Sequence, residues 1–423
     1  MVRWIYNLLF PLVFLFFIPG IVIKLIRRPG WKKTFAERFG IFAPERVREL
    51  REFRGAVWIH SVSVGETQIA LDLIRRWRQL HPERKFVIST TTTTGQQLAR
   101  DRGMDGMTVI FCPVDFIWWV RKVFRLFDPS MLVVLETELW PNMLAEARRR
   151  CGKVFLVNGR MSDKSSRGYA RFRCFFAPVL ANFTRILVQT DTDAERFHRV
   201  APGADITVTG NLKFDRSVPE RLSPIDLSEY FGSGPRRVLL ASCTHAGEET
   251  LIAAAFLRLK PEYPDLRLVI VPRHAERAAD IALQLKELDL SFCRRTRGLD
   301  SGGPVDALLA DTTGEMFGFI AAADLVIMGK SMAGHNEGHN LIEPAIFAKP
   351  IITGRELTNF RFVLEVLRAT DGLVTIAADS ELDAAVRRLL DDPVAARQMG
   401  ERAEQAISRH RGATDKTINI LEA

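Results

Sequence analysis

The stretch Asp324–Gly354, DLVIMGKSMAGHNEGHNLIEPAIFAKPIITG, decides the fold class of this 423-residue chain. Its apolar run Leu325–Met328 predicts a buried strand, and Gly329–His339 follows as a loop of small and polar residues. An apolar, helical segment opens at Asn340, and Pro350–Thr353 predicts the next strand. In such a unit the loop lies at the carboxyl ends of parallel strands, which is where open sheets bind ligands.

This loop fits two roles equally well. The unpaired N–H groups at the start of a helix carry partial positive charge and suit a phosphate group. Asn340 with Glu343 three residues later is also a capping box, which needs no ligand, and Gly334 and Gly338 then only make turns. The rest of the chain has to decide between a nucleotide site and plain structure.

The composition fits a folded protein of two domains. The length allows two cores, and the five cysteines are scattered without a CxxC pair, which argues against a zinc site or a disulfide framework. That cysteine usage fits a reducing compartment. The absence of GxGxxG and GxxxxGK[ST] patterns argues against a dehydrogenase or a P-loop enzyme. The net charge of +9 suits an anionic lipid surface or nucleic acid.

The N-terminal segment favours the lipid surface. Trp4–Ile23 has no charged residue, and about 20 apolar residues are needed to span a bilayer. Pro11 and Pro19 also allow a broken segment that lies in the interface. We expect a membrane anchor with the rest of the chain in the cytoplasm, because a basic cluster follows it. The cluster consists of Lys24, Arg27, Arg28, Lys32 and Lys33.

Apolar strands alternate with helical stretches from Ala56 onwards, which predicts parallel sheets covered on both faces. We expect an α/β fold with two Rossmann-like, doubly wound domains that face each other across a cleft. The strands expected in the first half are 56–60, 85–90, 108–111, 131–135, 154–158 and 185–189. Those expected in the second half are 237–241, 267–271, 307–310, 325–328, 350–353 and 373–376.

The predicted organisation has five parts. An anchor and basic segment (1–33) precede the first Rossmann-like domain (34–209). A proline-containing linker (210–234) leads to the second domain (235–392). The final helices (393–423) are expected to pack back across the linker.

Polar side chains follow several strands of the first half, where parallel strands end at one edge of the sheet. Ser63, Thr94 and Ser162 are good helix N-caps, but capping uses one residue per loop and each loop holds more polar residues than that. We therefore favour a polar cleft that hydrogen-bonds a sugar. The loops are HSVSVGE (60–66), TTTTTG (90–95), ETELWPN (136–142) and NGRMS (158–162).

Together with motifs elsewhere, these segments resemble the 3-deoxy-D-manno-octulosonic acid (Kdo) transferases of Gram-negative bacteria. Each motif alone is weak, but their order and spacing are specific and cover nearly the whole chain. The further motifs are ERFG (37–40), GNLKFD (210–215), TH with GEE (244–249), PRH (272–274) and GHN with EP (338–344). Those enzymes are membrane-associated glycosyltransferases of the GT-B fold that move Kdo from CMP-Kdo to a lipid A precursor.

The resemblance implies direct, inverting transfer with Glu37 as the base that takes the acceptor proton. It implies the CMP-Kdo donor, a lipid A precursor such as lipid IVA, and the cytoplasmic face of the inner membrane. No His, Asp or Cys cluster in the sequence has metal-ligand spacing, so we expect no metal and no cofactor. The acceptor-binding residues would be Arg38, Ser61, Ser63, Gly65, Glu66, Thr92, Glu136, Glu138, Asn158 and Arg160. The CMP-Kdo-binding residues would be Lys213, Thr244, His245, Pro272, Arg273, His274, Gly314, Glu315, Met316, Gly329, Ser331, His339, Asn340 and Glu343.

In this reading the Gly329–Ser331 loop and the helix start at Asn340 stabilise the charge of the departing CMP. The donor half also departs from the family pattern. Cys243 stands where Ser is usual, Lys330 follows Gly329 where a second Gly is usual, and Met316 and Phe319 replace the usual Leu and Tyr. The alternatives are another GT-B enzyme with a different nucleotide sugar, and a non-catalytic membrane-bound homologue.

Overall fold

The structure is a computed structural model that describes residues 2–27, 35–216, 222, 225–299 and 303–423. It divides into two compact units. Unit 1 comprises the residues up to Asp215 together with Arg411–Ala423, and unit 2 comprises Arg216–His410. The expected basic residues Arg28, Lys32 and Lys33 lie outside the described residues, as do the side chains of Lys24 and Arg27.

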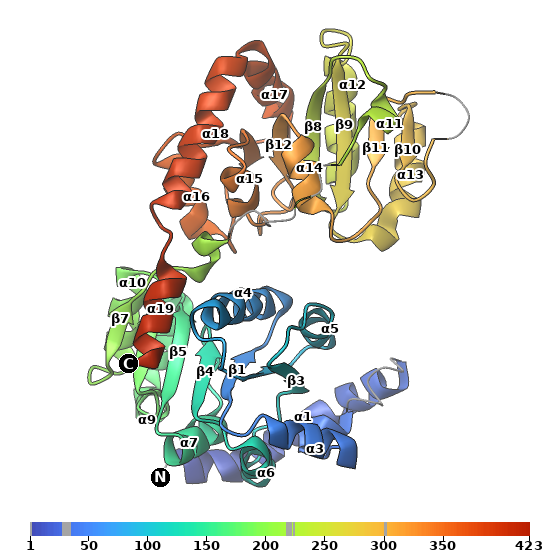
Figure 1. The fold of residues 1–423 in the computed structure, drawn as a ribbon. Coiled ribbons are helices and arrows are strands. Elements are labelled where there is room, and N and C mark those ends of the chain that lie inside the picture. The colour runs from blue at the N-terminus through green and yellow to red at the C-terminus, as the bar shows by residue number, and fades with distance from the viewer. Residues whose placement is uncertain (1, 28–34, 217–221, 223–224, 300–302) are drawn as a thin grey trace. The chain divides into compact units, whose positions relative to one another are not determined.

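Unit 1 is built on a parallel sheet in the order β3-β2-β1-β4-β5-β6-β7 (Figure 1). Its central strands are fully buried and therefore consist of nearly continuous apolar runs. The strands are β1 (Val57–Ser61), β2 (Phe86–Thr90), β3 (Met107–Phe111), β4 (Met131–Leu135), β5 (Val154–Gly159), β6 (Arg185–Val188) and β7 (Ile206–Val208).

Helices cover both faces of this sheet, as the ribbon shows (Figure 1). The chain steps outwards from β1 to β2 and β3 and then returns to the other side of β1 as β4, so the strand order reverses between β1 and β4. The helices are α1 (Val2–Arg27), η1 (Ala36–Phe39), α3 (Pro44–Glu52), α4 (Val64–Leu80), α5 (Thr93–Asp101), α6 (Ile117–Phe127), α7 (Pro141–Arg150), α8 (Asp163–Arg171), α9 (Arg173–Leu180), α10 (Asp191–Val200), η2 (Leu212–Asp215) and α19 (Ala413–Glu422).

Unit 2 repeats this architecture with a parallel sheet in the order β10-β11-β9-β8-β12-β13-β14. Here the strand order reverses between β8 and β12. The strands are β8 (Arg237–Thr244), β9 (Leu266–Pro272), β10 (Phe292–Arg294), β11 (Ala307–Leu309), β12 (Leu325–Met328), β13 (Ile351–Gly354) and β14 (Val374–Ile376).

The core of unit 2 lies between this sheet and the helices on its two faces. The helices are α11 (Ser228–Phe231), α12 (Glu248–Leu259), η3 (Ala275–Arg277), α13 (Ala278–Glu287), α14 (Met316–Ala322), α15 (Ile342–Ile346), α16 (Arg361–Arg368), η4 (Asp379–Glu381), α17 (Leu382–Asp391) and α18 (Pro393–Ser408). Two doubly wound parallel sheets confirm the expected fold class.

The residues of the expected linker (210–234) are divided between the two units, and so are the C-terminal helices (393–423). Leu227, Tyr230 and Phe231 are buried in the core of unit 2, so the second half of the 210–234 segment belongs to that unit. The helix α18 packs against α15, α16 and α17 in unit 2, whereas α19 packs against α4 and η2 in unit 1. The chain therefore passes from unit 2 back to unit 1 between these two helices.

One face of α1 rests on unit 1. Asn7 exchanges side-chain hydrogen bonds of 3.1 and 2.7 Å with Asn142 at the start of α7, and the rings of Phe10 and Phe14 lie 5.1 and 5.4 Å from that of Phe116. Within α1, the window Arg3–Gly20 is long and apolar enough to cross a membrane.

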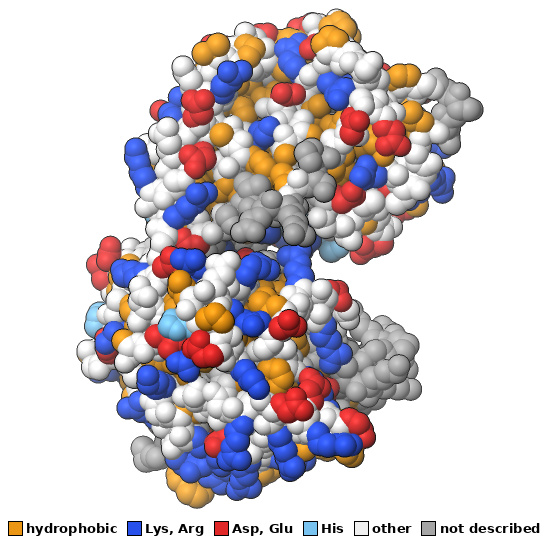
Figure 2. All heavy atoms as spheres, viewed as in Figure 1, with side chains coloured by type: hydrophobic (Ala, Val, Ile, Leu, Met, Phe, Trp, Pro, Cys, Tyr) orange, Lys and Arg blue, Asp and Glu red, His pale blue; other side chains and the backbone are white. Residues whose placement is uncertain are grey.

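The opposite face of α1 is apolar and exposed. Leu8 and Phe16 are 71% and 85% exposed, and Trp118 on the neighbouring α6 is 62% exposed. Lys and Arg side chains gather at the end of unit 1 that carries α6 and α7 (Figure 2). Arg121 and Arg149 on these helices are among the half-exposed cations of this region.

Candidate functional site

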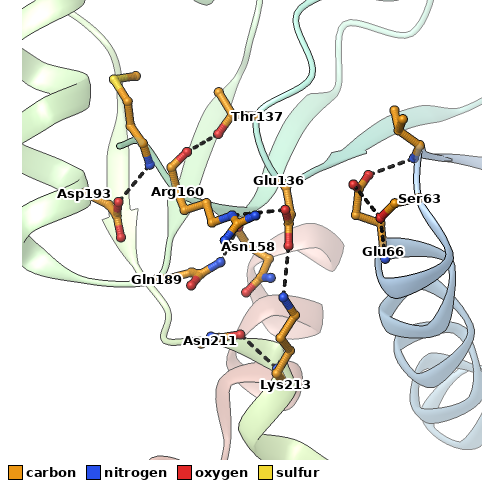
Figure 3. A network of polar contacts seen from close by, with 12 residues as sticks. Ser63, Glu66, Glu136, Thr137, Asn158, Arg160, Gln189, Asp193, Asn211 and Lys213 are labelled. Atoms are coloured by element: carbon orange, nitrogen blue, oxygen red, sulfur yellow. Dashed lines mark hydrogen bonds and ion pairs between the residues drawn. The ribbon is translucent and has the colours of Figure 1, made fainter. Parts of the chain in front are cut away.

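A polar cluster lies where the strand order of unit 1 reverses. We call Glu66, Glu136, Glu138, Arg160 and Lys213 the switch-point cluster. The Glu136 carboxylate lies between two cations: Oε2 accepts from Arg160 Nε at 3.1 Å, and Oε1 accepts from Lys213 Nζ at 3.3 Å (Figure 3). Lys213, expected to bind the donor, thus lies in unit 1 beside residues expected to bind the acceptor.

Two strand ends next to the cluster hold side-chain-bearing residues in the left-handed region. Glu136 has φ +54° and Asn158 has φ +57°, which costs a non-glycine residue free energy and is concentrated at functional sites. Asn158 is fully buried, and its Oδ1 accepts from the N–H of Leu212 at 3.0 Å. Its carbonyl accepts from Gln189 Nε2 at 3.0 Å (Figure 3). Asn158 therefore ties β5 to β6 and to η2.

Several expected acceptor residues are occupied by capping. Ser63 Oγ accepts from the N–H of Glu66 at 3.3 Å, and the Glu66 carboxylate returns to Val62 N–H at 2.7 Å and Ser63 Oγ at 2.9 Å. This arrangement resembles a capping box at the start of α4, except that the carboxylate accepts from the N–H of Val62, one residue before the N-cap Ser63. Gly65 lies in the first turn of the same helix. Thr92, rather than the expected Thr94, caps α5, and Ser61 Oγ lies buried 3.1 Å from Thr67 Oγ1.

Glu138 holds the most perturbed carboxyl group of the switch-point cluster. Burial, followed by the negative charges of Glu66 and Glu136, raises its pKa to about 7. The three carboxylates are thus close enough for like-charge repulsion, which favours a protonated Glu138 near neutral pH.

The stability of the protein should fall as pH rises because of Glu138. Between the ordinary pKa near 4.5 and the folded pKa near 7, the folded chain holds a proton that the unfolded chain has released. This contribution is fully present below pH 4.5 and is lost above pH 7. Because the side chain is partly exposed, we expect about 1 kcal/mol, or a decrease in Tm of about 3 °C, between pH 5 and 8. In Glu138→Gln this part of the decrease in Tm should vanish. If thermal unfolding shows the same difference in Tm between pH 5 and pH 8 in the variant as in wild type, Glu138 is not the group that titrates.

Glu37 lies away from this cluster's ion pairs, in the wall of a cavity of about 890 Å³ in unit 1. The cavity is lined by residues of η1, α3, α5 and β3. Glu37 Oε1 lies 3.9 Å from a guanidinium nitrogen of Arg100, and Oε2 accepts weakly from the N–H of Phe111 at 3.5 Å. Arg46 on α3 lines the same cavity and pairs with Glu49. A carboxylate with cations beside it suits proton transfer from an anionic substrate.

The peptide around Glu37 is fixed by its neighbours. Glu37 lies in the short 3₁₀ turn η1, which ends at Gly40, whose φ of +62° suits glycine. Arg38 is buried with its guanidinium 4.0 Å from the centre of the Phe111 ring, and its carbonyl accepts from the N–H of Val114 at 2.8 Å. Arg38 therefore holds the turn against β3, while Glu37 next to it faces the cavity.

In unit 2, the loop after β12 is organised by the buried side chain of Glu248. Its Oε1 accepts from the N–H groups of Ser331 and Met332 at 2.9 and 3.0 Å. Its Oε2 accepts from the N–H groups of Lys330 and His245, both at 2.8 Å. The N–H groups of Lys330 and Ser331, which we expected to face the leaving phosphate, are thus consumed by a carboxylate of the protein itself.

The expected helix start is also corrected. The helix α15 begins at Ile342, two residues after Asn340, and spans only Ile342–Ile346. Asn340 Oδ1 accepts from the N–H of Ile342 at 3.2 Å, and Glu343 forms an ion pair with Arg216. Ser331 is buried and its Oγ bridges Met328 O at 2.6 Å and Gly354 N at 3.0 Å, which ties β12 to β13.

Four histidines gather at the carboxyl edge of the unit 2 sheet. The Nε2 atoms of His245 and His339 lie 3.0 Å apart, and the His245 ring lies 5.9 Å from that of His274 and 5.5 Å from that of His335. Burial, followed by nearby positive charges, lowers the pKa of His245 to about 4 and that of His339 to about 3. Both rings are therefore neutral at physiological pH, and one donates a hydrogen to the other.

The remaining expected donor residues surround the same edge. Arg273 follows Pro272 at the end of β9, and its N–H donates to the carbonyl of Thr244 at 3.0 Å. Glu315 makes a two-point ion pair with Arg295 at 2.6 and 2.8 Å. It directly precedes α14, whose first residue Met316 accepts through Sδ from Ser242 Oγ at 3.2 Å, and Gly314 has φ +89°.

Sequence reasoning did not single out Arg46 and Arg100 beside Glu37, or Lys330 and His335 in unit 2, as site residues. The two arginines lie on helices whose sequences contain no recognisable motif, so only the folded structure shows that they line the cavity. Lys330 was visible in the sequence as a departure from the family pattern, whereas His335 stands in a loop of small and polar residues without a motif of its own. Across the described ranges, no group of three or more His, Cys, Asp or Glu side chains is arranged to hold a metal ion.

Comparison with known proteins agrees with the resemblance seen in the motifs. Residues 33–216 match the sequence family described as 3-deoxy-D-manno-octulosonic-acid transferase (kdotransferase). A 3-deoxy-D-manno-octulosonic acid transferase of Bordetella pertussis is 32% identical over 413 residues, which cover 93% of this chain and 95% of that one. The enzyme of the same name from Haemophilus influenzae is 27% identical over 400 residues, or 94% of this chain and 92% of that one.

Among solved structures, a UDP-N-acetylglucosamine 2-epimerase superposes with a TM-score of 0.59 over 87% of this chain and 95% of its own, at 15% identity. At that identity the likeness concerns the fold alone, which is of the GT-B type. The sequence similarity to the B. pertussis enzyme extends through both units. The chain therefore belongs to the 3-deoxy-D-manno-octulosonic acid transferase family and is a glycosyltransferase.

Proposed function

We propose that this enzyme transfers Kdo from CMP-Kdo to a lipid A precursor, lipid IVA, in lipopolysaccharide biosynthesis. The observation that carries the proposal is the similarity to the B. pertussis Kdo transferase, which covers 93% of this chain. The position of Glu37 in a cavity with two arginines supports it, because the reaction needs a base next to an anionic acceptor.

In the proposed reaction, the acceptor hydroxyl attacks the anomeric carbon of Kdo from the face opposite the phosphate. The new C–O bond forms as the bond from that carbon to the phosphate oxygen breaks, so the configuration inverts and CMP leaves. The proton of the acceptor hydroxyl passes to a carboxylate oxygen of Glu37. Arg100 and Arg46 place positive charge in the same cavity, where an acceptor phosphate adds two negative charges.

The residues at the carboxyl edge of unit 2 are proposed to hold the donor. The neutral His245–His339 pair, Arg273 and His274 offer hydrogen bonds and positive charge to the nucleotide. Glu343 would accept hydrogen bonds from the ribose hydroxyls. These hydrogen bonds would replace its ion pair with Arg216. No cofactor or metal is part of this proposal.

We further propose that the enzyme works at the cytoplasmic face of the inner membrane. The exposed apolar face of α1, with Trp118 on α6, suits the acyl region of a bilayer, and the cations of α6 and α7 suit anionic headgroups. The contacts of Asn7 and Phe10 with unit 1 support a helix held along this unit rather than one that is free of it. A lipid acceptor at this surface would bring its sugar headgroup to unit 1.

The identity of the donor tests the proposal. The full chain is reconstituted in vesicles of phosphatidylethanolamine and phosphatidylglycerol that contain lipid IVA. It is incubated with CMP-Kdo, CMP-sialic acid or UDP-N-acetylglucosamine, and the mass of the lipid product is measured by mass spectrometry. We expect a Kdo-modified lipid from CMP-Kdo alone. Modified lipid from another donor would point to a different GT-B transferase, and epimerised UDP-N-acetylglucosamine without lipid product would point to an epimerase.

A further inference from the structure

The strand order of unit 2 reverses between β8 and β12, and the ends of these two strands approach each other closely. A Cβ added to Gly329, directly after β12, would meet the carbonyl oxygen of Cys243 at 2.5 Å. Cys243 itself has φ +56°. Such a reversal is where an open α/β sheet binds its ligand, so residues that follow Gly329 lie at the mouth of the donor site.

Most main-chain N–H groups in the loop that starts at Gly329 already donate to other protein groups, so they cannot donate to an anion. The N–H groups of Lys330, Ser331 and Met332 all donate to Glu248. The N–H of Gly329 donates to Ser242 O at 2.8 Å, and the N–H of Gly338 donates to Lys330 O at 2.7 Å. In addition, the carboxylate of Glu248 opposes an anion placed over these N–H groups. The N–H groups of residues 329–332 are thus not available to a phosphate, and a positive charge at this point of the loop has to come from a side chain.

Lys330 carries the side chain best placed to neutralise the negative charge of a phosphate in this loop. Its backbone has φ +59°, the conformation that a glycine would adopt at this position, and its carbonyl closes the loop by accepting from Gly338. Its N–H donates to the same oxygen of Glu248, Oε2, as the N–H of His245, so the backbone of Lys330 lies beside that of His245. Consistent with this position, the positive charge of Lys330 contributes to the lowered pKa values of His245 and His339.

The ammonium group is also free to change partner. Lys330 Nζ lies 3.9 Å from Glu337 Oε1, at the outer limit of an ion pair, and the Glu337 side chain is 41% exposed. An exposed pair of this kind contributes little free energy, so a phosphate replaces Glu337 at small cost. Arg273, whose N–H donates to the carbonyl of Thr244 next to His245, supplies a second positive charge at this edge of the sheet.

We propose that Lys330 binds the phosphate of the sugar nucleotide and replaces, with a side-chain cation, the main-chain phosphate site that Glu248 occupies. This inference rests on the proposed CMP-Kdo donor and adds a specificity-determining residue to it. The phosphate lies between Lys330 and the His245–His339 pair, and the ammonium neutralises charge that grows on the phosphate as the sugar leaves.

The test compares CMP with cytidine, which lacks only the phosphate. Binding of each to the full chain is measured by calorimetry for wild type, Lys330→Gly and Lys330→Arg. Glycine suits the left-handed backbone at 330, so the loop should keep its shape. We expect Lys330→Gly to weaken CMP by about 10- to 100-fold and leave cytidine unchanged, and Lys330→Arg to restore most of the affinity. Lys286→Ala, which removes an exposed cation on α13, should change neither ligand.

Each other outcome overturns the inference in a distinguishable way. Equal CMP affinity in wild type and Lys330→Gly would show that Lys330 does not touch the phosphate. Parallel loss of CMP and cytidine would show that the variant damages the site in general. If Lys330→Gly binds CMP-Kdo more weakly but binds CMP with unchanged affinity, Lys330 contacts the carboxylate of the sugar and not the phosphate. Failure of wild type to bind CMP at all would overturn the CMP-sugar donor together with this inference.

Discussion

Replacement of Glu37 by alanine should lower the rate of Kdo transfer by about 10²- to 10³-fold while leaving CMP affinity unchanged. The carboxylate lines the cavity of unit 1 and lies 3.9 Å from Arg100, so it is placed to receive a proton there. Its removal takes away the carboxylate proposed to accept the proton, and the donor residues of unit 2 are not altered. Initial rates of lipid modification and calorimetry with CMP provide the two measurements.

Glu49→Gln is a matched control for this substitution. Glu49 lines the same cavity and carries the same functional group, but it is engaged with Arg46 and with Thr108, whose Oγ1 donates to it at 3.0 Å. Its loss should cost less than about tenfold in rate. Equal rates in wild type and Glu37→Ala would make Glu37 structural. Glu138, whose pKa near 7 suits a general base, would then be tested before Glu66, whose two carboxylate oxygens are occupied by hydrogen bonds at the start of α4.

Replacement of Glu248 by alanine should lower the free energy of unfolding of unit 2 by about 4 kcal/mol. The side chain is fully buried and accepts hydrogen bonds from N–H groups after both β8 and β12. Its loss leaves several buried N–H groups without an acceptor and separates the two loops that form the edge of the site. Chemical denaturation gives the free energy, and hydrogen exchange of residues 329–335 reports the loop itself.

Glutamine is not a neutral substitute at this position. Each oxygen of Glu248 accepts from two N–H groups, so an amide nitrogen on either side would face donors instead of acceptors. We therefore expect Glu248→Gln to destabilise unit 2 substantially as well. Glu276→Gln, which changes a carboxylate that is 78% exposed, is the control and should be neutral. Unchanged hydrogen exchange of the loop in Glu248→Gln would contradict this account of how the loop is held.

The alternation of apolar runs was sufficient to predict most strands of both sheets. Two examples are the expected strands Val154–Asn158, which begins with four apolar residues, and Leu325–Met328, which is apolar throughout. Both became buried strands within one residue of the expected bounds. The strands β7 and β10 were missed, because they are three residues long and only partly buried, so they carry no such run. Short edge strands depend on pairing with a neighbour, which sequence periodicity does not report.

The site was less accessible to sequence reasoning because its geometry depends on tertiary contacts. The glycine-containing loop after β12 has the composition of a phosphate site, and nothing in its own residues reveals that Glu248, more than 80 positions earlier, fills it. Likewise, Thr92 rather than Thr94 caps α5, although both stand in the same threonine run. Glu37 was accessible through the family motif, but the cavity around it depends on the packing of α3, α5 and β3, which that motif does not report.

The most direct test of the central proposal is to quantify CMP and Kdo-modified lipid in the same reaction, with the full chain in vesicles that contain lipid IVA. The account predicts that CMP and transferred Kdo appear in equal amounts, that both require the lipid, and that both fall together in Glu37→Ala. Release of CMP without lipid product would indicate a hydrolase. Neither product from a chain that binds CMP would mean a non-catalytic homologue and would contradict the proposal.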